Sequence, residues 1–239
     1  MIDGLFTFNN LLFFVLVLVN WISILLCYRY FGKTGLFCWM AFGVLVANVG
    51  ILKNAEIFWL MASLGNVTHI TLCLIVDIIN ENYGYKEAKK AVYIGFTALI
   101  LFTIIMQINL LFNPSMFDTG HEHMLALFKI MPWICAGSIL GYLISNMIDV
   151  WIFSTIKKYL PDDKYLWIRK LGSTTISQAF DVVIFVIIGF STFASMEYMI
   201  ALMTSIYIFK VLINTFDTPF IYISKRIQKK LKENGIAID

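Results

Sequence analysis

The sequence predicts an all-α integral membrane protein, and three observations support this fold class. Hydrophobic residues make up 60% of the chain and charged residues only 14%, too little charge to cover a soluble domain of this length. Apolar runs long enough to cross a hydrocarbon core of about 30 Å recur along the chain. The basic residues gather after alternate runs, as they do on the cytoplasmic side of membrane proteins.

Seven apolar segments are long enough to form transmembrane helices. The first has no basic region before it and no small-residue cleavage site, so we expect it to be retained rather than removed as a signal peptide. The third and fifth are longer than a perpendicular crossing requires and should tilt. Proline residues in the fifth and seventh lie near segment ends, where helices tolerate them. The segments cover roughly residues 5–30, 34–52, 57–82, 91–112, 127–156, 174–195 and 199–223.

The distribution of the basic residues predicts the orientation. Of the 18 Lys and Arg residues, all but three follow the first, third, fifth or seventh segment. This asymmetry places the N-terminus outside and the C-terminus in the cytoplasm of a multi-pass cell-membrane protein. The residues on the predicted cytoplasmic side are Arg29, Lys33, Lys86, Lys89, Lys90, Lys157, Lys158, Lys164, Arg169, Lys170, Lys225, Arg226, Lys229, Lys230 and Lys232.

Charged residues inside the predicted spans indicate a binding site or pathway. Asp181 lies about half-way along the sixth span and Lys210 lies in the seventh. Counted from the external turn near Glu197, their depths differ by only about 5 Å at the rise of an α-helix. The two could therefore pair, either around a ligand or as a buried ion pair that only sets helix register.

Other spans carry polar side chains at similar depth. Acidic and amide groups at i, i+3 or i, i+4 spacing share one helix face, which indicates a polar cavity. Carboxylates, carboxamides and an aromatic ring suit a planar, donor-rich heterocycle such as a guanine-like base, or an amine-bearing solute. Solvated roles for Glu81 and Asp149, and a helix–helix hydrogen bond for His69, are the alternatives. The candidates are His69, Asp77, Asn80, Glu81, Asn146, Asp149, Gln178 and Phe185.

Three motifs resemble the queuosine precursor transporters, also called the vitamin uptake transporter family. "VDIINENYGYKEAKK" begins at Val76, "SQAFDVVIFVIIGF" at Ser177 and "FKVLINTFDTPFIY" at Phe209. The resemblance implies import of 7-deazaguanine bases: the 7-cyano or 7-aminomethyl queuosine precursors, or queuine. It also implies a six-helix bundle like the substrate-binding components of energy-coupling-factor vitamin transporters. The domain prediction is then an extra N-terminal helix (1–32), the transporter core (33–228) and a basic tail (229–239).

Carried over by position, the family's acidic pair becomes Asp77 and Glu81, its second motif gives Gln178 and Asp181, and its late lysine becomes Lys210. The chain departs from the family pattern in two places. Its first apolar segment is additional to a six-helix core. His69-Ile70 also stands where a proline is expected, about two turns before the aspartate of the first motif.

We expect a transporter that needs no cofactor or metal and binds no nucleic acid. One alternative is a substrate-binding component that depends on a separate ATP-driven module. No ATP-binding G-x-x-x-x-G-K-[ST] occurs in the sequence, so the ATPase would be another chain. Another is an intramembrane aspartyl enzyme, although no G-x-G-D occurs. Small residues such as Gly43, Ala47, Gly137 and Gly141 allow close helix contact within a subunit or in a homodimer. The transported base and the energy source are left open.

Overall fold

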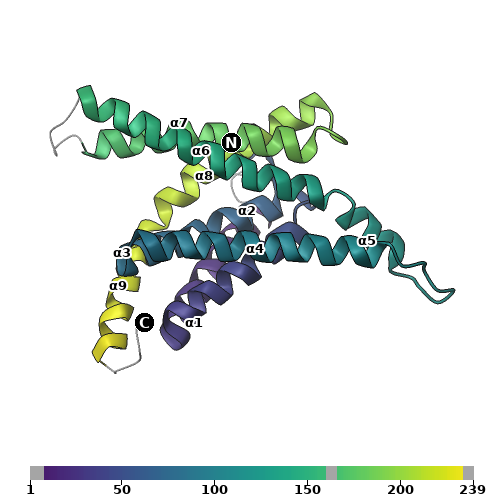
Figure 1. Cartoon of the computed structure of the whole chain (residues 1–239), viewed down its shortest axis with the longest axis horizontal. Helices are drawn as coiled ribbons and strands as arrows, with labels where there is room; N and C mark the ends of the chain where they lie inside the picture. Colours follow the sequence, from purple (N-terminus) through teal and green to yellow (C-terminus); the bar gives the residue numbers. More distant parts are fainter. Residues whose placement is uncertain (1–7, 160–165, 234–239) are drawn as a thin grey trace. The chain divides into compact units, whose positions relative to one another are not determined.

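The computed structural model describes residues 8–159 and 166–233. Within these residues the chain is almost entirely helical, which confirms the predicted all-α class (Figure 1). The described chain divides into two compact units, one from residues 1–128 and 208–239 and one from 129–207. The elements are α1 (Phe8–Val49), β1 (Asn54–Ile57), β2 (Leu60–Ser63), α2 (Leu64–Thr71), α3 (Cys73–Tyr83), α4 (Tyr85–Leu110), α5 (His121–Phe128), α6 (Met131–Tyr159), α7 (Leu166–Phe190), α8 (Met196–Phe216) and α9 (Thr218–Glu233).

In the first unit, α1 contains the first two predicted spans and bends sharply between them. Gly32 has φ 59° and ψ −146°, a left-handed conformation that glycine adopts without a Cβ clash. The main-chain N–H of Phe58 donates to Asn10 Oδ1 at 2.9 Å. The start of α1 therefore lies beside the hairpin that follows its end, so the two arms of α1 run antiparallel.

The predicted helix over residues 57–82 is wrong for its first seven residues. Strands β1 and β2 pair antiparallel with Ile57 opposite Leu60, and a two-residue turn joins them. Both turn residues, Phe58 (φ 48°) and Trp59 (φ 62°), have positive φ, which matches the twist of a tight hairpin. A short apolar run fits a strand as well as a helix, which is why hydropathy extended the span too far.

The remainder of that span is two short helices rather than one. The series of α-helical hydrogen bonds is interrupted at Leu72, whose N–H donates to the carbonyl of His69 at 3.1 Å. Thr71 Oγ1 donates to the carbonyl of Thr68 at 2.6 Å, a local bond that favours bending. At Gly65, α2 packs so closely on the end of α1 that a Cβ would meet the Ala47 carbonyl oxygen of α1 and would lie 2.6 Å from the nitrogen of Ile51, two residues past α1.

Helix α4 confirms the fourth predicted span and begins a few residues before it. Gly84, with φ 87°, separates it from α3. Its buried residues recur at helical spacing and pack against α1. Ala88, Gly95 and Leu99 are among them. At the start of α4, Glu87 forms an ion pair with Lys33 at 3.3 Å.

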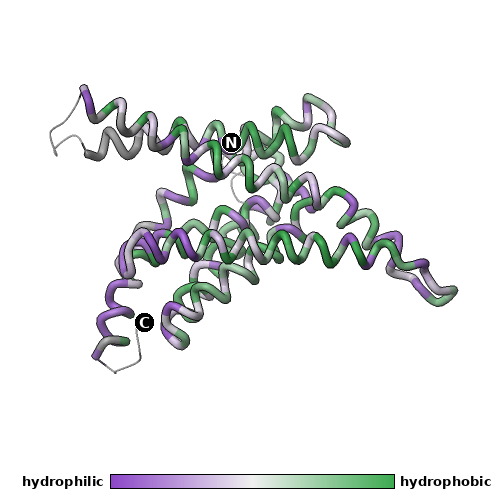
Figure 2. The backbone as a smooth tube through the Cα atoms, viewed as in Figure 1, coloured by the Kyte–Doolittle hydropathy of each residue, from purple (hydrophilic) through white to green (hydrophobic). Residues whose placement is uncertain are grey.

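The predicted seventh span is interrupted at Asp217. Pro219 lies in the first turn of α9, where a missing N–H costs no helical bond. Helix α9 is amphipathic and packs against α1 and α3, with the rings of Trp21 and Phe220 4.6 Å apart. Figure 2 shows the polar character of α9 and of the α3–α4 junction. Residues 229–233 of the predicted tail belong to α9, and residues 234–239 lie outside the described chain.

The second unit contains α6, α7 and the first half of α8. Figure 1 shows α6 and α7 alongside each other, and their contacts pair Gly137 with Phe185 and Gly141 with Asp181. Residues later in α6 contact residues earlier in α7, so the two helices run antiparallel. The predicted close approach at these two glycines is thus found within the subunit.

Four stretches of the described chain are long and apolar enough to cross a membrane: Phe8–Val49, Tyr85–Leu110, His121–Asp149 and Met196–Phe216. A shorter apolar stretch covers Thr175–Phe190. Large apolar side chains are exposed along these helices, as expected for surfaces that face lipid. These findings support a multi-pass membrane protein. Part of the predicted fifth-to-sixth loop, 160–165, lies outside the described residues.

Candidate functional site

The predicted binding site consists of eight of the ten candidates, without Asn80 and Asp149, and these eight divide equally between the two units. Helix α2 carries His69, exposed in its last turn, and α3 carries Asp77 and Glu81, both exposed. Lys210 lies on α8 in the part that belongs to the first unit and is partly buried. The residues of the second unit are Asn146 on α6 and Gln178, Asp181 and Phe185 on α7. Because Asp181 and Lys210 belong to different units, their expected ion pair stays a prediction.

Glu81 has a partner that the sequence reasoning missed. Its Oε1 lies 2.6 Å from Lys225 Nζ on α9, with about half of each side chain exposed. The hydrogen bond and the charge of Glu81 raise the pKa of Lys225 above its ordinary value. Exposed ion pairs contribute little to stability, so this pair adds little to the packing of α9 on α3.

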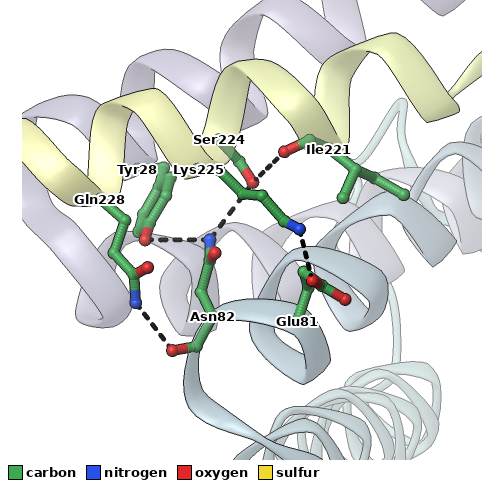
Figure 3. Close-up of polar contacts among 7 residues, drawn as sticks. All are labelled: Tyr28, Glu81, Asn82, Ile221, Ser224, Lys225 and Gln228. Atoms are coloured by element: carbon green, nitrogen blue, oxygen red, sulfur yellow. Dashed lines mark hydrogen bonds and ion pairs between the residues drawn. The ribbon is translucent and has the colours of Figure 1, made fainter.

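Beside this pair, Asn82 is the centre of a polar network that joins α1, α3 and α9 (Figure 3). Its Nδ2 donates to Tyr28 Oη and to Ser224 Oγ, each at 3.2 Å. Its main-chain carbonyl accepts from Gln228 Nε2 at 2.7 Å. Tyr28 and Ser224 are fully buried, so these bonds satisfy polar groups that water does not reach.

The network also includes a second tyrosine and a hydrogen bond within α9. The hydroxyls of Tyr28 and Tyr83 lie 3.2 Å apart, and Ser224 Oγ donates to the carbonyl of Ile221 at 2.7 Å. No local sequence signal marks these partners, because Asn82 lies 54 residues from Tyr28 and 142 from Ser224. The arrangement joins the end of α3, where Asn82 lies five residues after Asp77, to α1 and α9.

In the second unit, the α6–α7 interface contains two carboxylates. Asp149 Oδ1 accepts from Ser177 Oγ at 3.2 Å. Asp181, partly buried, lies against Gly141: a Cβ there would be 2.9 Å from Asp181 Oδ1. Gln178 lies three residues before Asp181 on α7 and is also partly buried, so the two share a helix face.

The other two predicted residues of this unit are Asn146 and Phe185. Asn146 on α6 is exposed. Phe185 lies one turn beyond Asp181 and packs edge-on against Phe190, with ring centroids 5.8 Å apart. Carboxamide, carboxylate and ring thus follow one another along α7. Among the described residues, no group of three His, Cys, Asp or Glu side chains could hold a metal ion.

Comparison with known proteins gives two similarities. A family model described as "Putative vitamin uptake transporter" matches residues 63–224, a range that includes all eight predicted site residues. The "Probable queuosine precursor transporter" of Bacillus subtilis (strain 168) is 36% identical over 220 residues, covering 92% of this chain and 96% of that protein. No solved structure matches the chain.

Proposed function

We propose, from the premise that this chain belongs to the vitamin uptake transporter family, that it imports queuosine precursors across the cell membrane. The observation that carries the proposal is the 36% identity to a relative of that name over nearly the full length of both chains. A member of a transporter family is not an enzyme, so the intramembrane aspartyl enzyme is discarded as an alternative.

The proposed substrate is a 7-deazaguanine base, either a 7-cyano or 7-aminomethyl precursor or queuine. Such a base presents a ring N–H and an amino group on one edge, and a carboxylate accepts both at once. Its flat ring stacks on an aromatic side chain. The family motifs around Asp77 and Asp181 and the chemistry of these side chains support this choice.

Each unit carries candidate recognition residues of its own. In the second unit, Asp181 accepts the paired N–H groups, Gln178 and Asn146 read the remaining polar edge, and Phe185 stacks on the ring. Gln178, Asp181 and Phe185 lie along α7 and Asn146 lies on α6.

In the first unit, Asp77 and Glu81 are the alternative acceptors of the N–H groups. Lys210 donates to the ring carbonyl, and His69 contributes a further hydrogen bond.

The proposed topology has seven crossings, with the N-terminus outside and the C-terminus in the cytoplasm. The reversal at Gly32 supports two crossings within α1, and α2 with α3 would make one. The reversal also lies at the proposed boundary between an extra N-terminal helix (1–32) and a six-helix core (33–228) akin to energy-coupling-factor binding components. Lys33, Glu87 and Lys225 lie on contacts around one end of the first unit, which supports a cytoplasmic face there.

Transport by the chain alone would require the site to open to each side in turn. The alternative, a binding component with a separate ATP-driven module, is favoured by the resemblance to energy-coupling-factor components. Uptake of base by the purified chain in liposomes without ATP separates these two mechanisms. A homodimer is compatible with either.

The function is tested by rescue of tRNA modification in a cell that lacks queuosine synthesis. Cells expressing the chain receive each candidate base in turn, and queuosine in tRNA is measured. We expect the wild-type chain to restore queuosine with at least one base and Asp181→Asn and Lys210→Ala to reduce it strongly. Asp118→Asn, in the exposed external loop, is the matched control. No rescue by any base refutes the function, and normal rescue by both site variants refutes the assigned site.

A further inference from the structure

Three chain segments meet at one end of the first unit: the bend of α1, the α3–α4 junction and α9. Lys33 pairs with Glu87 at 3.3 Å, and Lys225 pairs with Glu81 at 2.6 Å. Helix α4 is one of the four stretches that could cross a membrane, and α9 begins two residues after α8, which is another. This end of the unit therefore lies at a membrane surface, because a crossing helix leaves the hydrocarbon where its apolar residues stop.

Helix α9 has two different faces. Ser224 is fully buried and Gln228 donates to the main chain of α3, so this side of the helix packs on the unit (Figure 3). Tyr222, Arg226 and Lys229 follow one another at i, i+4 and i+7 spacing and are all exposed. Residues at this spacing share a helix face, so a tyrosine and two cations form one stripe on the side of α9 that faces away from the unit.

The cations of α9 are crowded together. Lys225, Arg226, Lys229 and Lys230 are exposed and lie at i, i+3 or i, i+4 spacing, at which like charges repel. Lys225 has Glu81 as its partner, whereas none of the other three forms an ion pair with a described carboxylate. The helix therefore carries positive charge that the described part of the chain does not compensate, and an anionic surface would neutralise it.

Exposed aromatic side chains at the same end favour a membrane over a soluble acidic partner. Tyr222 is 66% exposed beside the cations of α9. Tyr30 and Phe31 at the bend of α1 and Tyr85 at the start of α4 are as exposed as Tyr222. Tyrosine is enriched at the membrane–water interface, and these rings lie on three elements at the level where the apolar stretches end. Cations and rings together thus fit the headgroup region of a bilayer.

We propose that Arg226, Lys229 and Lys230 bind the phosphate groups of anionic phospholipids, and that this contact keeps α9 folded against α1 and α3. The Asn82 network holds the inner side of the helix, and the lipid phosphates hold its outer side. Zwitterionic lipids carry a compensating cation on each headgroup, so lipids with a net negative charge are required. The inference concerns the lipid contact and does not depend on the solute that is transported.

Hydrogen–deuterium exchange of the full-length chain tests this contact in nanodiscs of two compositions, phosphatidylcholine alone and phosphatidylcholine with phosphatidylglycerol. At low salt, α9 amides should exchange about 5-fold more slowly in the discs with phosphatidylglycerol, the effect of about one cation near an anionic surface. The difference should shrink at high salt, where exposed charges are screened. Amides in the middle of α4 should exchange equally in both discs.

The variant Arg226→Gln/Lys229→Gln/Lys230→Gln should reduce the difference between the two discs to less than about 2-fold. In discs of phosphatidylcholine alone it should hold α9 as well as the wild type does, because no contact within the described chain is lost. Two control variants should keep the wild-type difference. Arg226→Lys/Lys229→Arg/Lys230→Arg retains the charges, and Lys53→Gln/Lys129→Gln removes exposed cations elsewhere.

Three results would overturn the proposal. Equal exchange of wild-type α9 in both discs leaves the basic side of the helix to a soluble acidic partner. A difference that persists in the triple glutamine variant reflects the lower pH at an anionic surface, which slows exchange without any contact to α9. Faster exchange of that variant in phosphatidylcholine alone assigns the cations a role inside the protein. A failure of base uptake by the wild-type chain refutes the proposed function and leaves these results unchanged.

Discussion

Replacing Asn82 by alanine should loosen α9 from the end of α3. The change removes the two hydrogen bonds that Nδ2 donates to Tyr28 and Ser224, each at 3.2 Å. The bond from Gln228 Nε2 remains, because it goes to the main-chain carbonyl of residue 82. Each lost bond contributes about 0.5–1.5 kcal/mol net, so the docking of α9 should weaken by about 1–3 kcal/mol.

Hydrogen–deuterium exchange of the purified chain in lipid nanodiscs measures this change directly. Local opening of α9 governs exchange of its amides, and 1–3 kcal/mol corresponds to about 5- to 150-fold faster exchange. Amides in the middle of α4 should not change. The matched control is Asn80→Ala, which removes the same side chain from an exposed position on the same helix.

Two results would refute this reasoning. Unchanged exchange of α9 in Asn82→Ala would mean that apolar contacts such as Trp21 with Phe220 hold the helix by themselves. Equal acceleration in Asn80→Ala would mean that any substitution on α3 loosens α9, without a role for the network.

Two further predictions follow from single contacts in the first unit. Because Glu81 raises the pKa of Lys225, the contribution of the pair to α9 docking is complete below the ordinary lysine pKa and is lost as pH rises through the raised value. Glu81→Gln should therefore let Lys225 react with an amine-acylating reagent at lower pH, and an unchanged pH profile contradicts the pairing. Gly65→Ala should destabilise the fold by about 1–3 kcal/mol through overpacking, because its Cβ would meet the Ala47 carbonyl oxygen. Thermal unfolding should show no comparable loss for Gly120→Ala, whose nearest neighbour would be 3.6 Å away, and equal losses would contradict the close contact.

Hydropathy predicted the helical class and most element positions because burial in lipid acts on runs of about 20 residues. The hydropathy prediction failed where an apolar run is too short for its periodicity to distinguish a strand from a helix. Residues 57–63 form a strand and turn, and the helices break at Leu72 and Asp217. At Leu72 no proline or glycine marks the break, so the sequence offered no signal. Gly32, in contrast, lies between two predicted spans, and its φ of 59° fits a residue without a Cβ.

Some residues around the candidate site could be predicted from the sequence, and others could not. Asp77, Glu81 and Asp181 are predicted site residues, from the family motifs and because acidic residues at membrane depth are rare and costly, and this stays a prediction. The motifs could not identify Asn82, Tyr28 or Ser224 as partners, since those residues become neighbours only when α1, α3 and α9 pack together.

By itself, then, the amino-acid sequence determined that this chain is an all-α membrane protein of a transporter family, with acids inside its spans. These are properties of composition, local periodicity and motif, which need no knowledge of contacts. Only the tertiary structure decided that Glu81 meets Lys225 and that Gly141 lies against the Asp181 carboxylate. Both facts depend on ångström-scale distances between helices far apart in the chain, and such distances are set by the packing of all the side chains in each unit together.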